Sequence, residues 1–265
     1  WFNPTYSGTF MFPINTTRYR STTGFNGRVR FLIMHYTAAN FSVSVNALTG
    51  PNVSAHYLVP NIVDPHYRRA GFTERQIFSL VDEDKRAWHA GVSSWAGRNN
   101  LNDTSIGIEV VNQASDNQGQ FTFPPYHPQQ VEAIAQLAKD ILQRHPDISP
   151  THVLGHSDIS VGRKSDPGPM LPWHELYLRG IGAWFAPATQ ERFASTYSAN
   201  GVPARAEVIA LFKKYGYDVG AATTEVGFQR LVRAFQLHFR PENYNGVLDV
   251  QTAANLAALV SKYMP

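Results

Sequence analysis

Two histidines and one aspartate in this 265-residue chain have the residue types and the sequence setting of metal ligands. His35 ends the apolar run FLIMHYT, and α/β sheets commonly present functional side chains at the strand edge. His156 and Asp166 lie in THVLGHSDISVGRKSDPGP, where glycine and proline fix the path of a loop. Neutral His35 and His156 with the carboxylate of Asp166 supply three ligands of a catalytic zinc ion, which leaves a fourth position for water. His35 taken alone is equally well interpreted as a half-buried strand residue.

The absence of cysteine limits the kinds of metal site and catalysis that the chain can support. The chain has no cysteine and ten histidines, so thiol catalysis, Cys-ligated zinc and iron–sulfur clusters are excluded. His152 and His156 share the i, i+4 spacing of helical zinc pairs. The intervening Val153-Leu154-Gly155 favours an extended chain, in which residues four apart lie about 13 Å from each other. We therefore exclude this pair as ligands of one ion.

The side chain of Glu109 is suited to proton transfer, and that of Lys164 is suited to stabilising negative charge. Glu109 lies within the apolar run SIGIEVVN, where a carboxylate is costly to bury unless it faces a charge, a metal or a cleft. We predict that Glu109 is the general base that takes a proton from the zinc-activated water and delivers it to the leaving amine. Lys164 is predicted to stabilise the developing oxyanion. A structural salt bridge with an arginine is the alternative for Glu109.

Tyr36 and His89 are the predicted substrate contacts. Tyr36 follows His35 in sequence, and His89 lies in Trp88-His89-Ala90-Gly91, where an aromatic and an imidazole beside glycine are suited to lining a sugar or peptide cleft. The alternative for Trp88 is a position in the hydrophobic core without a role in binding.

The order of the predicted elements indicates an α/β fold with a central mixed β-sheet flanked by helices. Strands are predicted at 31–36, 55–59, 77–81 and 105–112, and a short helix at 41–48. A longer helix at 127–145 has an apolar face that recurs at steps of three and four, made by Val131, Ile134, Ala135, Ala138, Ile141 and Leu142. Residues 61–75 contain Pro65 and Gly71 and are predicted to be an inserted loop.

The sequence divides into four parts. Residues 1–27 are predicted to form an irregular arm lying over the surface, 28–180 the catalytic domain, 181–203 a linker and 204–265 a small all-α three-helix domain. The three helices are predicted at 204–215, 225–239 and 250–263, and the second has an apolar stripe made by Phe228, Leu231, Val232, Phe235 and Phe239.

Charge and hydropathy exclude two classes of partner. The formal charge is +3, and the 23 lysines and arginines are scattered without a basic run, so we expect no nucleic-acid partner. The longest apolar stretches are far shorter than the ~20 residues needed to cross a bilayer, so we expect no transmembrane segment in this chain. The chain begins at Trp1, which leaves open a processed N-terminus and a lost targeting segment.

Five segments resemble the zinc-dependent N-acetylmuramoyl-L-alanine amidases related to phage lysozyme-type amidases and animal peptidoglycan recognition proteins, most closely the bacterial branch. In order along residues 28–180 they are FLIMHYTA around His35, VSAHYLV around His56, AWHAGVSSW around His89, SIGIEVVN around Glu109, and VLGHSDISVGRKSDPGPMLPW, which ends at Trp173. The C-terminal segments FQRLVRAFQLHF and GVLDVQTAANLAAL look like a three-helix peptidoglycan-binding module.

The resemblance implies zinc bound by His35, His156 and Asp166, with Glu109 as general base and Lys164 at the tetrahedral intermediate. It implies hydrolysis of the amide between N-acetylmuramic acid and L-alanine of the stem peptide, in peptidoglycan or a muropeptide. An attached wall-binding module favours enzymes of the cell envelope over cytosolic recyclers of muropeptides. A periplasmic location in cell wall turnover is therefore expected, and attachment to the outer membrane through a segment before Trp1 stays open.

Two alternatives to the amidase activity remain. The first is a non-catalytic peptidoglycan-recognition protein, since some relatives of this fold have lost metal ligands. The second is a zinc endopeptidase that cuts within the stem peptide by similar metal chemistry.

Overall fold

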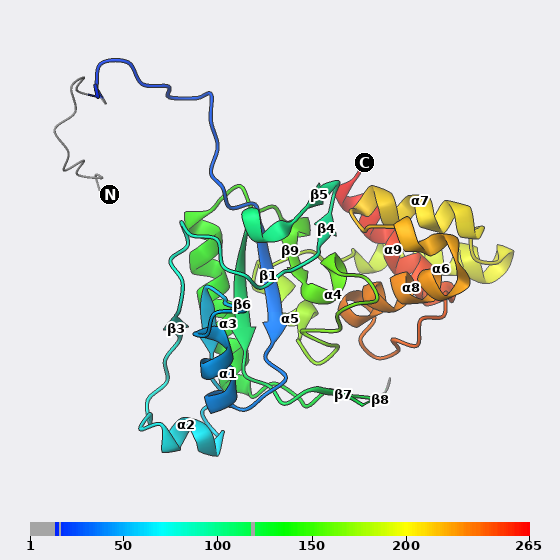
Figure 1. Cartoon of the computed structure of the whole chain (residues 1–265). Helices are drawn as coiled ribbons and strands as arrows, with labels where there is room; N and C mark the ends of the chain where they lie inside the picture. Colours follow the sequence, from blue (N-terminus) through cyan, green and yellow to red (C-terminus); the bar gives the residue numbers. More distant parts are fainter. Residues whose placement is uncertain (1–13, 16, 118–119) are drawn as a thin grey trace.

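The computed structural model, which describes residues 14, 15, 17–117 and 120–265, is built around a five-stranded β-sheet (Figure 1). The strand order is β3–β2–β6–β1–β9. Strand β6 is parallel to β1 and β2, β1 is parallel to β9, and β3 is antiparallel to β2, which confirms the predicted mixed sheet. The strands are β1 (Phe31–Tyr36), β2 (Tyr57–Val59), β3 (Phe78–Ser79), β6 (Ser105–Val110) and β9 (Val153–Gly155).

Helices flank this sheet, as predicted. They are α1 (Phe41–Leu48), α3 (Pro128–Arg144), α4 (His156–Ile159) and α5 (Trp173–Leu178). Helix α3 begins with a capping box, in which His127 Nδ1 accepts from Gln129 N and Gln130 Oε1 accepts from His127 N. Five of its six predicted apolar residues are buried, and Leu142 is half-buried. This burial of an amphipathic face stabilises the packing of α3 on the sheet.

The prediction of a loop at 61–75 is wrong in part, because it contains helix α2 (Pro65–Arg69). Asp64 caps this helix through Oδ1, which accepts from His66 N at 2.8 Å, and Pro65 occupies its first turn. Tyr67 is buried with its ring 5.0 Å from that of Phe41. Five helical residues are too few to show a periodic apolar pattern in the sequence.

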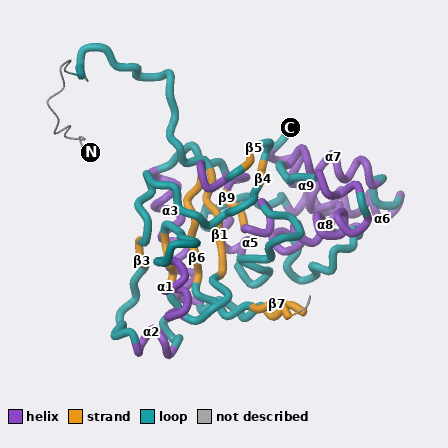
Figure 2. The backbone as a smooth tube through the Cα atoms, viewed as in Figure 1, coloured by secondary structure: helices purple, strands orange, loops and turns teal. Residues whose placement is uncertain are grey.

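Two small hairpins extend the structure beside the sheet. The first is formed by β4 (Ser94–Trp95) and β5 (Arg98–Asn99), and the second by β7 (Ser115–Asn117) and β8 (Gln120–Thr122). Figure 2 shows the second hairpin running out from the sheet toward the C-terminal helices. There, the ring of Phe123 contacts that of Tyr244 at 5.7 Å.

The C-terminal part is helical and has one helix more than predicted. Helices α7 (Arg205–Tyr215), α8 (Glu225–Phe239) and α9 (Val250–Tyr263) confirm the three predicted ones. Helix α6 (Pro187–Asn200) lies against α9 and occupies most of the segment predicted as a linker, so the expectation of an irregular 181–203 is wrong. Only Gln190 of α6 is buried, and a helix without a buried apolar stripe gives no periodic signal in the sequence.

The helical part shares one continuous apolar core with the sheet. The buried ring of Trp95 lies 5.9 Å from that of Tyr215 and 4.7 Å from that of Tyr217. Between these tyrosines, Gly216 has a φ of 137°, and a Cβ there would lie 2.6 Å from the Trp95 ring. Only glycine combines this backbone conformation with so close an approach.

A buried carboxylate also joins the two parts. Asp158, at the end of the sheet, has no exposed surface. Its Oδ1 accepts from the Tyr217 hydroxyl at 2.6 Å, and its Oδ2 accepts from His238 Nδ1 at 2.7 Å and from Gly155 N at 2.8 Å. The helical part is therefore attached to the sheet by apolar and polar contacts together.

The predicted arm is irregular over the part that the structure describes. Residues 1–13 and 16 lie outside the described residues, and 14, 15 and 17–27 contain no helix or strand. These residues run away from the body in Figure 1, so the expectation that the arm lies over the surface is wrong for them. The exposed rings of Tyr19 and Phe25 show that residues 17–27 bury little apolar surface. Within the described residues, no helix is both long and apolar enough to cross a membrane.

Candidate active site

The carboxyl ends of three parallel strands bring predicted site residues to one edge of the sheet. His35 is near the end of β1 and Glu109 near the end of β6, and the two are paired in the strand register. His156 follows β9 directly as the first residue of α4. Asp166 comes from the loop after α4, where its carbonyl accepts from Ser157 N at 2.9 Å. Open α/β sheets place binding sites at such an edge.

His35, His156 and Asp166 converge on one point. His35 Nδ1 lies 3.1 Å from His156 Nδ1 and 2.8 Å from Asp166 Oδ2, and His156 Nδ1 lies 3.0 Å from the same oxygen. All three side chains are buried, and their ligand atoms form a group suited to a metal ion. The structure thus brings together the three residues that were predicted as ligands.

A chain of hydrogen bonds determines the tautomer of His35. Ser105 Oγ donates to Leu101 O at 2.6 Å, so it accepts from His89 Nε2 at 3.1 Å. Burial lowers the pKa of His89 well below its usual value, and its neutral ring therefore has an unprotonated Nδ1. This atom accepts from His35 Nε2 at 2.9 Å. The neutral ring of His35 consequently has no proton on Nδ1, the atom that faces His156 and Asp166.

His156 is held in the same tautomer by a backbone carbonyl. Its Nε2 donates to Ala90 O at 2.9 Å, because a carbonyl can only accept. Arg163 Nη2 donates to the same carbonyl at 2.9 Å and to Val92 O at 2.7 Å, which secures the segment that carries it. Arg163 Nη2 also lies 3.3 Å from His156 Nε2, but its shorter contact is with the carbonyl of Ala90. With Nε2 as the donor to Ala90 O, the neutral ring of His156 has its lone pair on Nδ1, the atom that faces the centre.

With both imidazoles in the neutral form that metal ligation requires, the converging atoms are three acceptors without a donor between them. Burial, followed by the effect of His156, lowers the pKa of His35 to about 4, so His35 is neutral at pH 7. Burial alone would raise the pKa of Asp166, but His156 and His35 together lower it well below its usual range, so Asp166 is ionised. Two lone pairs and a carboxylate oxygen within 3.1 Å of one another repel unless a cation lies among them. This donor set fits a metal ion.

Glu109 is a half-buried residue beside this centre, and the Oε2 atom of its carboxyl group is buried without a hydrogen-bond partner among the described residues. Burial, and next the charge of Asp166, raises the pKa of Glu109 well above its usual value, with Lys164 acting in the opposite direction. No arginine pairs with it among the described residues, so the alternative of a structural salt bridge is not supported. A buried carboxyl group with a raised pKa and a free oxygen is suited to proton transfer.

Residues 25–169 match the family model described as N-acetylmuramoyl-L-alanine amidase. The chain belongs to this family. N-acetylmuramoyl-L-alanine amidase AmiD of Escherichia coli is 44% identical over 238 residues, which are 89% of this chain and 84% of AmiD. This amidase also superposes on the crystal structure of AmpDh3 from Pseudomonas aeruginosa, with a TM-score of 0.93, 56% identity and coverage of 96% of this chain and 100% of that chain.

A second superposition adds a complex with a substrate. AmiD from E. coli, with the substrate anhydro-N-acetylmuramic acid-L-Ala-D-γ-Glu-L-Lys bound, superposes on this amidase with a TM-score of 0.81 at 41% identity. The match covers 92% of this chain and 93% of that chain. The predicted recognition as an N-acetylmuramoyl-L-alanine amidase and the predicted enzyme class are thus confirmed.

The remaining predicted residues of the amidase lie at different depths. Lys164 is exposed at the rim of the site, and half-buried Tyr36 ends β1 with its ring 6.3 Å from that of Phe123. The prediction for His89 is not supported, because its ring is buried behind His35 and both ring nitrogens are engaged there. The predicted alternative for Trp88, a core position, is wrong, since 52% of its surface is exposed.

Sequence reasoning missed the residues that support His35. Side chains alternate along a strand, so Ser105, Gly107 and Glu109 share one face of β6. The His89 ring packs over Gly107, where a Cβ would lie 2.5 Å from it. The sequence does contain a signal for this support: a serine and a glycine precede Glu109 at steps of two residues, on the same face of the strand.

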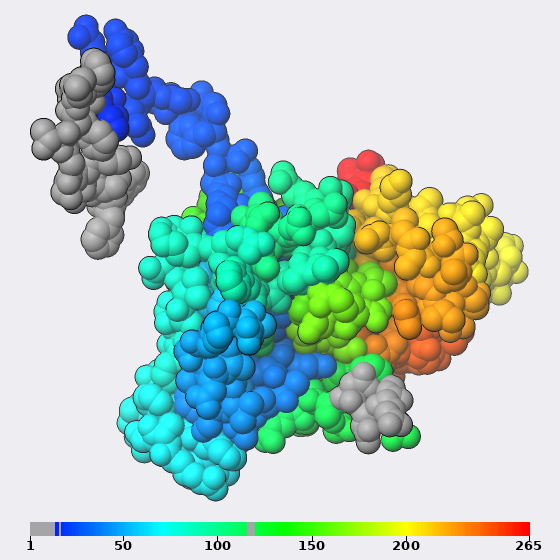
Figure 3. Space-filling model, viewed as in Figure 1, coloured from blue at the N-terminus to red at the C-terminus, as the bar shows by residue number. Residues whose placement is uncertain are grey.

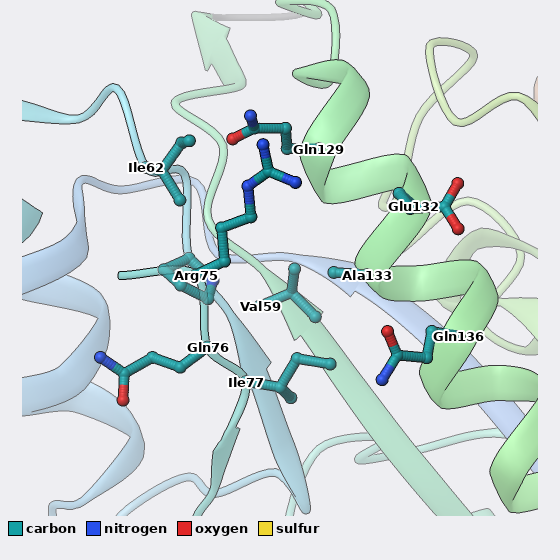
Figure 4. A pocket seen from close by; sticks show the side chains of 10 residues that line it. Val59, Ile62, Arg75, Gln76, Ile77, Gln129, Glu132, Ala133 and Gln136 are labelled. Atoms are coloured by element: carbon teal, nitrogen blue, oxygen red, sulfur yellow. The ribbon is translucent and has the colours of Figure 1, made fainter. Parts of the chain in front are cut away.

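A separate hollow of about 320 Å³ lies between β2 and helix α3 (Figure 4). Arg75, at the end of the loop that contains α2, lines it together with Gln129 and Glu132 of α3. None of the converging metal-ligand candidates lines this hollow. The 61–75 segment therefore borders a surface that is distinct from the candidate active site.

Proposed function

We propose that this amidase is a zinc-dependent hydrolase that cleaves the amide between N-acetylmuramic acid and the L-alanine of a peptidoglycan stem peptide. His35 Nδ1, His156 Nδ1 and Asp166 Oδ2 would hold the zinc ion. The observation that supports this most directly is the convergence of these three buried ligand atoms, which lie within 3.1 Å of one another as a group that could hold a metal ion. The substrate that AmiD binds has the bond in question, between anhydro-N-acetylmuramic acid and L-Ala.

Bound zinc would supply Lewis acidity, which polarises a carbonyl group and lowers the pKa of water to about 7. Glu109 then acts through Oε2, which takes a proton from the attacking water and passes it to the amide nitrogen as the C–N bond breaks. The ammonium group of Lys164 stabilises the negative charge that develops on the carbonyl oxygen. Tyr36, at the same end of β1 as His35, is proposed to contact the substrate.

Ser105→Ala tests whether the hydrogen-bond chain positions His35 for the metal. We expect the variant to fold and its zinc Kd to rise about 10-fold, because His89 Nε2 loses its acceptor and the orientation of both rings loosens. Competition with a chromophoric chelator measures this affinity without any turnover. Ser198→Ala, on the exposed surface of α6, is the matched control and should bind zinc as the wild type does. An unchanged Kd for Ser105→Ala would show that the chain does not tune the site.

The activity is tested with anhydro-N-acetylmuramic acid-L-Ala-D-γ-Glu-L-Lys and with intact sacculi, and the products are identified by mass spectrometry. We expect the intact tripeptide to be released from the small substrate, release to stop after treatment with a chelator, and release to return with added zinc. Shortened peptides would instead show an endopeptidase. Binding without any product, at full zinc occupancy, would show a non-catalytic recognition protein.

We propose further that residues 28–180 form the catalytic domain and that the helices of residues 204–265, with α6 beside them, bind peptidoglycan. Attachment of a binding module raises the effective concentration of a catalytic site on an insoluble polymer. This supports a periplasmic enzyme of cell wall turnover in the cell envelope, and attachment to the outer membrane remains part of the proposal. Comparison of the rates on sacculi and on the soluble substrate tests the binding role, since the preference for sacculi should depend on the helical part.

A further inference from the structure

A cleft of about 340 Å³ lies where helix α8 meets the loop that carries Lys164. The loop, in yellow-green, lies directly against the orange surface of α8 in Figure 3. Four of the residues that line the cleft are cations, Arg163 and Lys164 from the loop and Arg230 and Arg233 from α8. Phe121 of β8 forms another part of its wall. We call this space the basic cleft.

The basic cleft exists because α8 approaches the loop closely at one glycine. Gly162 has a φ of 73°, and a Cβ there would lie 2.7 Å from Arg230 Cδ and 3.2 Å from Arg230 Cβ. The aliphatic part of Arg230 thus packs on the loop, which leaves its guanidinium group to reach the cleft. Arg233, one turn further along α8, donates from Nη1 to Ser165 Oγ at 3.2 Å.

Arg230 and Lys164 have no acidic partner among the described residues of the basic cleft. None of its described lining residues is acidic, and neither Arg230 nor Lys164 forms an ion pair with another described residue. Several cations around one hollow create a positive potential that attracts an anion. A guanidinium group has a planar set of donors that matches a carboxylate in geometry.

The basic cleft adjoins the candidate active site along the chain. Lys164 lines the cleft, and Asp166 is only two residues further on, which corresponds to at most roughly 7 Å of extended chain. A peptide whose first amide lies at the metal ligands would therefore have its next residues within reach of Arg230. In L-Ala-D-γ-Glu-L-Lys these residues carry two carboxylates, since the γ-linkage leaves the α-carboxyl group of glutamate free.

We propose that the basic cleft binds a carboxylate of the stem peptide, with Arg230 as the main contact, and so determines specificity for acidic stems. This inference rests on the proposed function, because it assumes that the stem peptide leads away from the metal ligands. It makes α8 part of the site that selects the substrate, besides any role of the helical part in binding the cell wall.

Arg230→Gln tests this proposal with two substrates, the anhydro-muramyl tripeptide and its form with both peptide carboxylates amidated. For the acidic substrate we expect KM to rise about fivefold to tenfold, as for one charge-assisted contact at an accessible site, with kcat within about twofold. For the amidated substrate we expect wild type and variant to have the same KM. Arg192→Gln, an exposed arginine of α6, is the matched control and should match the wild type on both substrates.

Calorimetry with the free tripeptide and its amidated form measures binding independently of turnover. Arg230→Gln should weaken binding of the acidic tripeptide alone, and inorganic phosphate should not compete at millimolar concentrations. Equal effects on both forms, no effect on either, or efficient competition by phosphate would overturn the proposal. If the wild type fails to cleave the muramyl–alanine bond, the proposed function fails, and the tripeptide titration still decides whether Arg230 binds a carboxylate.

Discussion

Glu109→Gln is expected to lower kcat by about 10²- to 10⁴-fold while the protein still binds one zinc ion per chain. Glutamine has nearly the same shape as glutamate but cannot take a proton from water or give one to the amide nitrogen. The three ligand candidates lie on other segments and keep their contacts with one another. Single-turnover rates on the anhydro-muramyl tripeptide, together with metal analysis, measure the two quantities separately.

The same substitution should stabilise the metal-free protein at neutral pH. Burial and Asp166 raise the pKa of Glu109, so the folded protein retains a proton on Glu109 above pH 4.5, where the unfolded chain has lost it. The contribution of Glu109 to the free energy of unfolding therefore falls as pH rises, by at most about 1.4 kcal/mol per pH unit. Glutamine does not titrate, so the advantage of the variant over the wild type should grow between pH 5 and pH 8.

Glu132→Gln is the matched control for both measurements. Glu132 is exposed on α3, where it pairs with Arg179, and an exposed surface pair of this kind contributes little to stability. The control should keep full activity and show no growing advantage with pH. Retained activity in Glu109→Gln would remove Glu109 from the mechanism, and a pH-independent difference in unfolding would contradict a buried carboxyl group with a raised pKa.

The converging ligands could be predicted because they depend on sheet geometry. An apolar run that ends in His35 indicates a buried strand whose carboxyl end lies at a sheet edge, and Glu109 occupies the corresponding position of a similar run. Parallel strands bring these ends together whatever the lengths of the connections between them. Strand identity was therefore enough to expect His35 and Glu109 in one site, and the structure adds that their strands are neighbours in register.

The hydrogen bonds that hold the ligand side chains in place could not be predicted in the same way. The contact of His89 with His35 joins residues 54 positions apart, and it depends on how an irregular segment folds back over Gly107. A histidine in such a segment can face the cleft or lie behind it, and its residue type is the same in both cases. For this reason, the structure does not support the prediction that His89 contacts substrate.

The packing of the C-terminal helices against the sheet could not be predicted from sequence patterns either. The apolar stripe of α8 shows that the helix is buried on one side but does not identify its partner. The structure shows that His238 of α8 and Tyr217 share the carboxylate of Asp158, so the helical part is joined to the end of the sheet. Nothing in the spacing of three residues so far apart indicates that they meet.

Asp158→Ala is expected to lower the free energy of unfolding by about 3–5 kcal/mol. The substitution removes a carboxylate with no exposed surface and leaves the Tyr217 hydroxyl, His238 Nδ1 and Gly155 N without their acceptor. Urea denaturation followed by tryptophan fluorescence is a suitable measurement, because Trp95 and Trp173 are buried and Trp173 stacks on His238 at 3.8 Å. Zinc should be removed beforehand so that its binding does not contribute to the stability.

Asp140→Ala serves as the matched control, since Asp140 forms an exposed pair with Arg144 within α3 and should cost ~0.5 kcal/mol or less. If Asp158→Ala does not fold, Tyr217→Phe removes only one of the three hydrogen bonds and should cost about 1–2 kcal/mol. A loss below 1 kcal/mol for Asp158→Ala would show that the apolar contacts around Trp95 are sufficient to hold the helical part. A loss in the expected range would mean that the carboxylate beside His156 links the stability of the metal-ligand loop to that of the helices, so that neither part keeps its full stability alone.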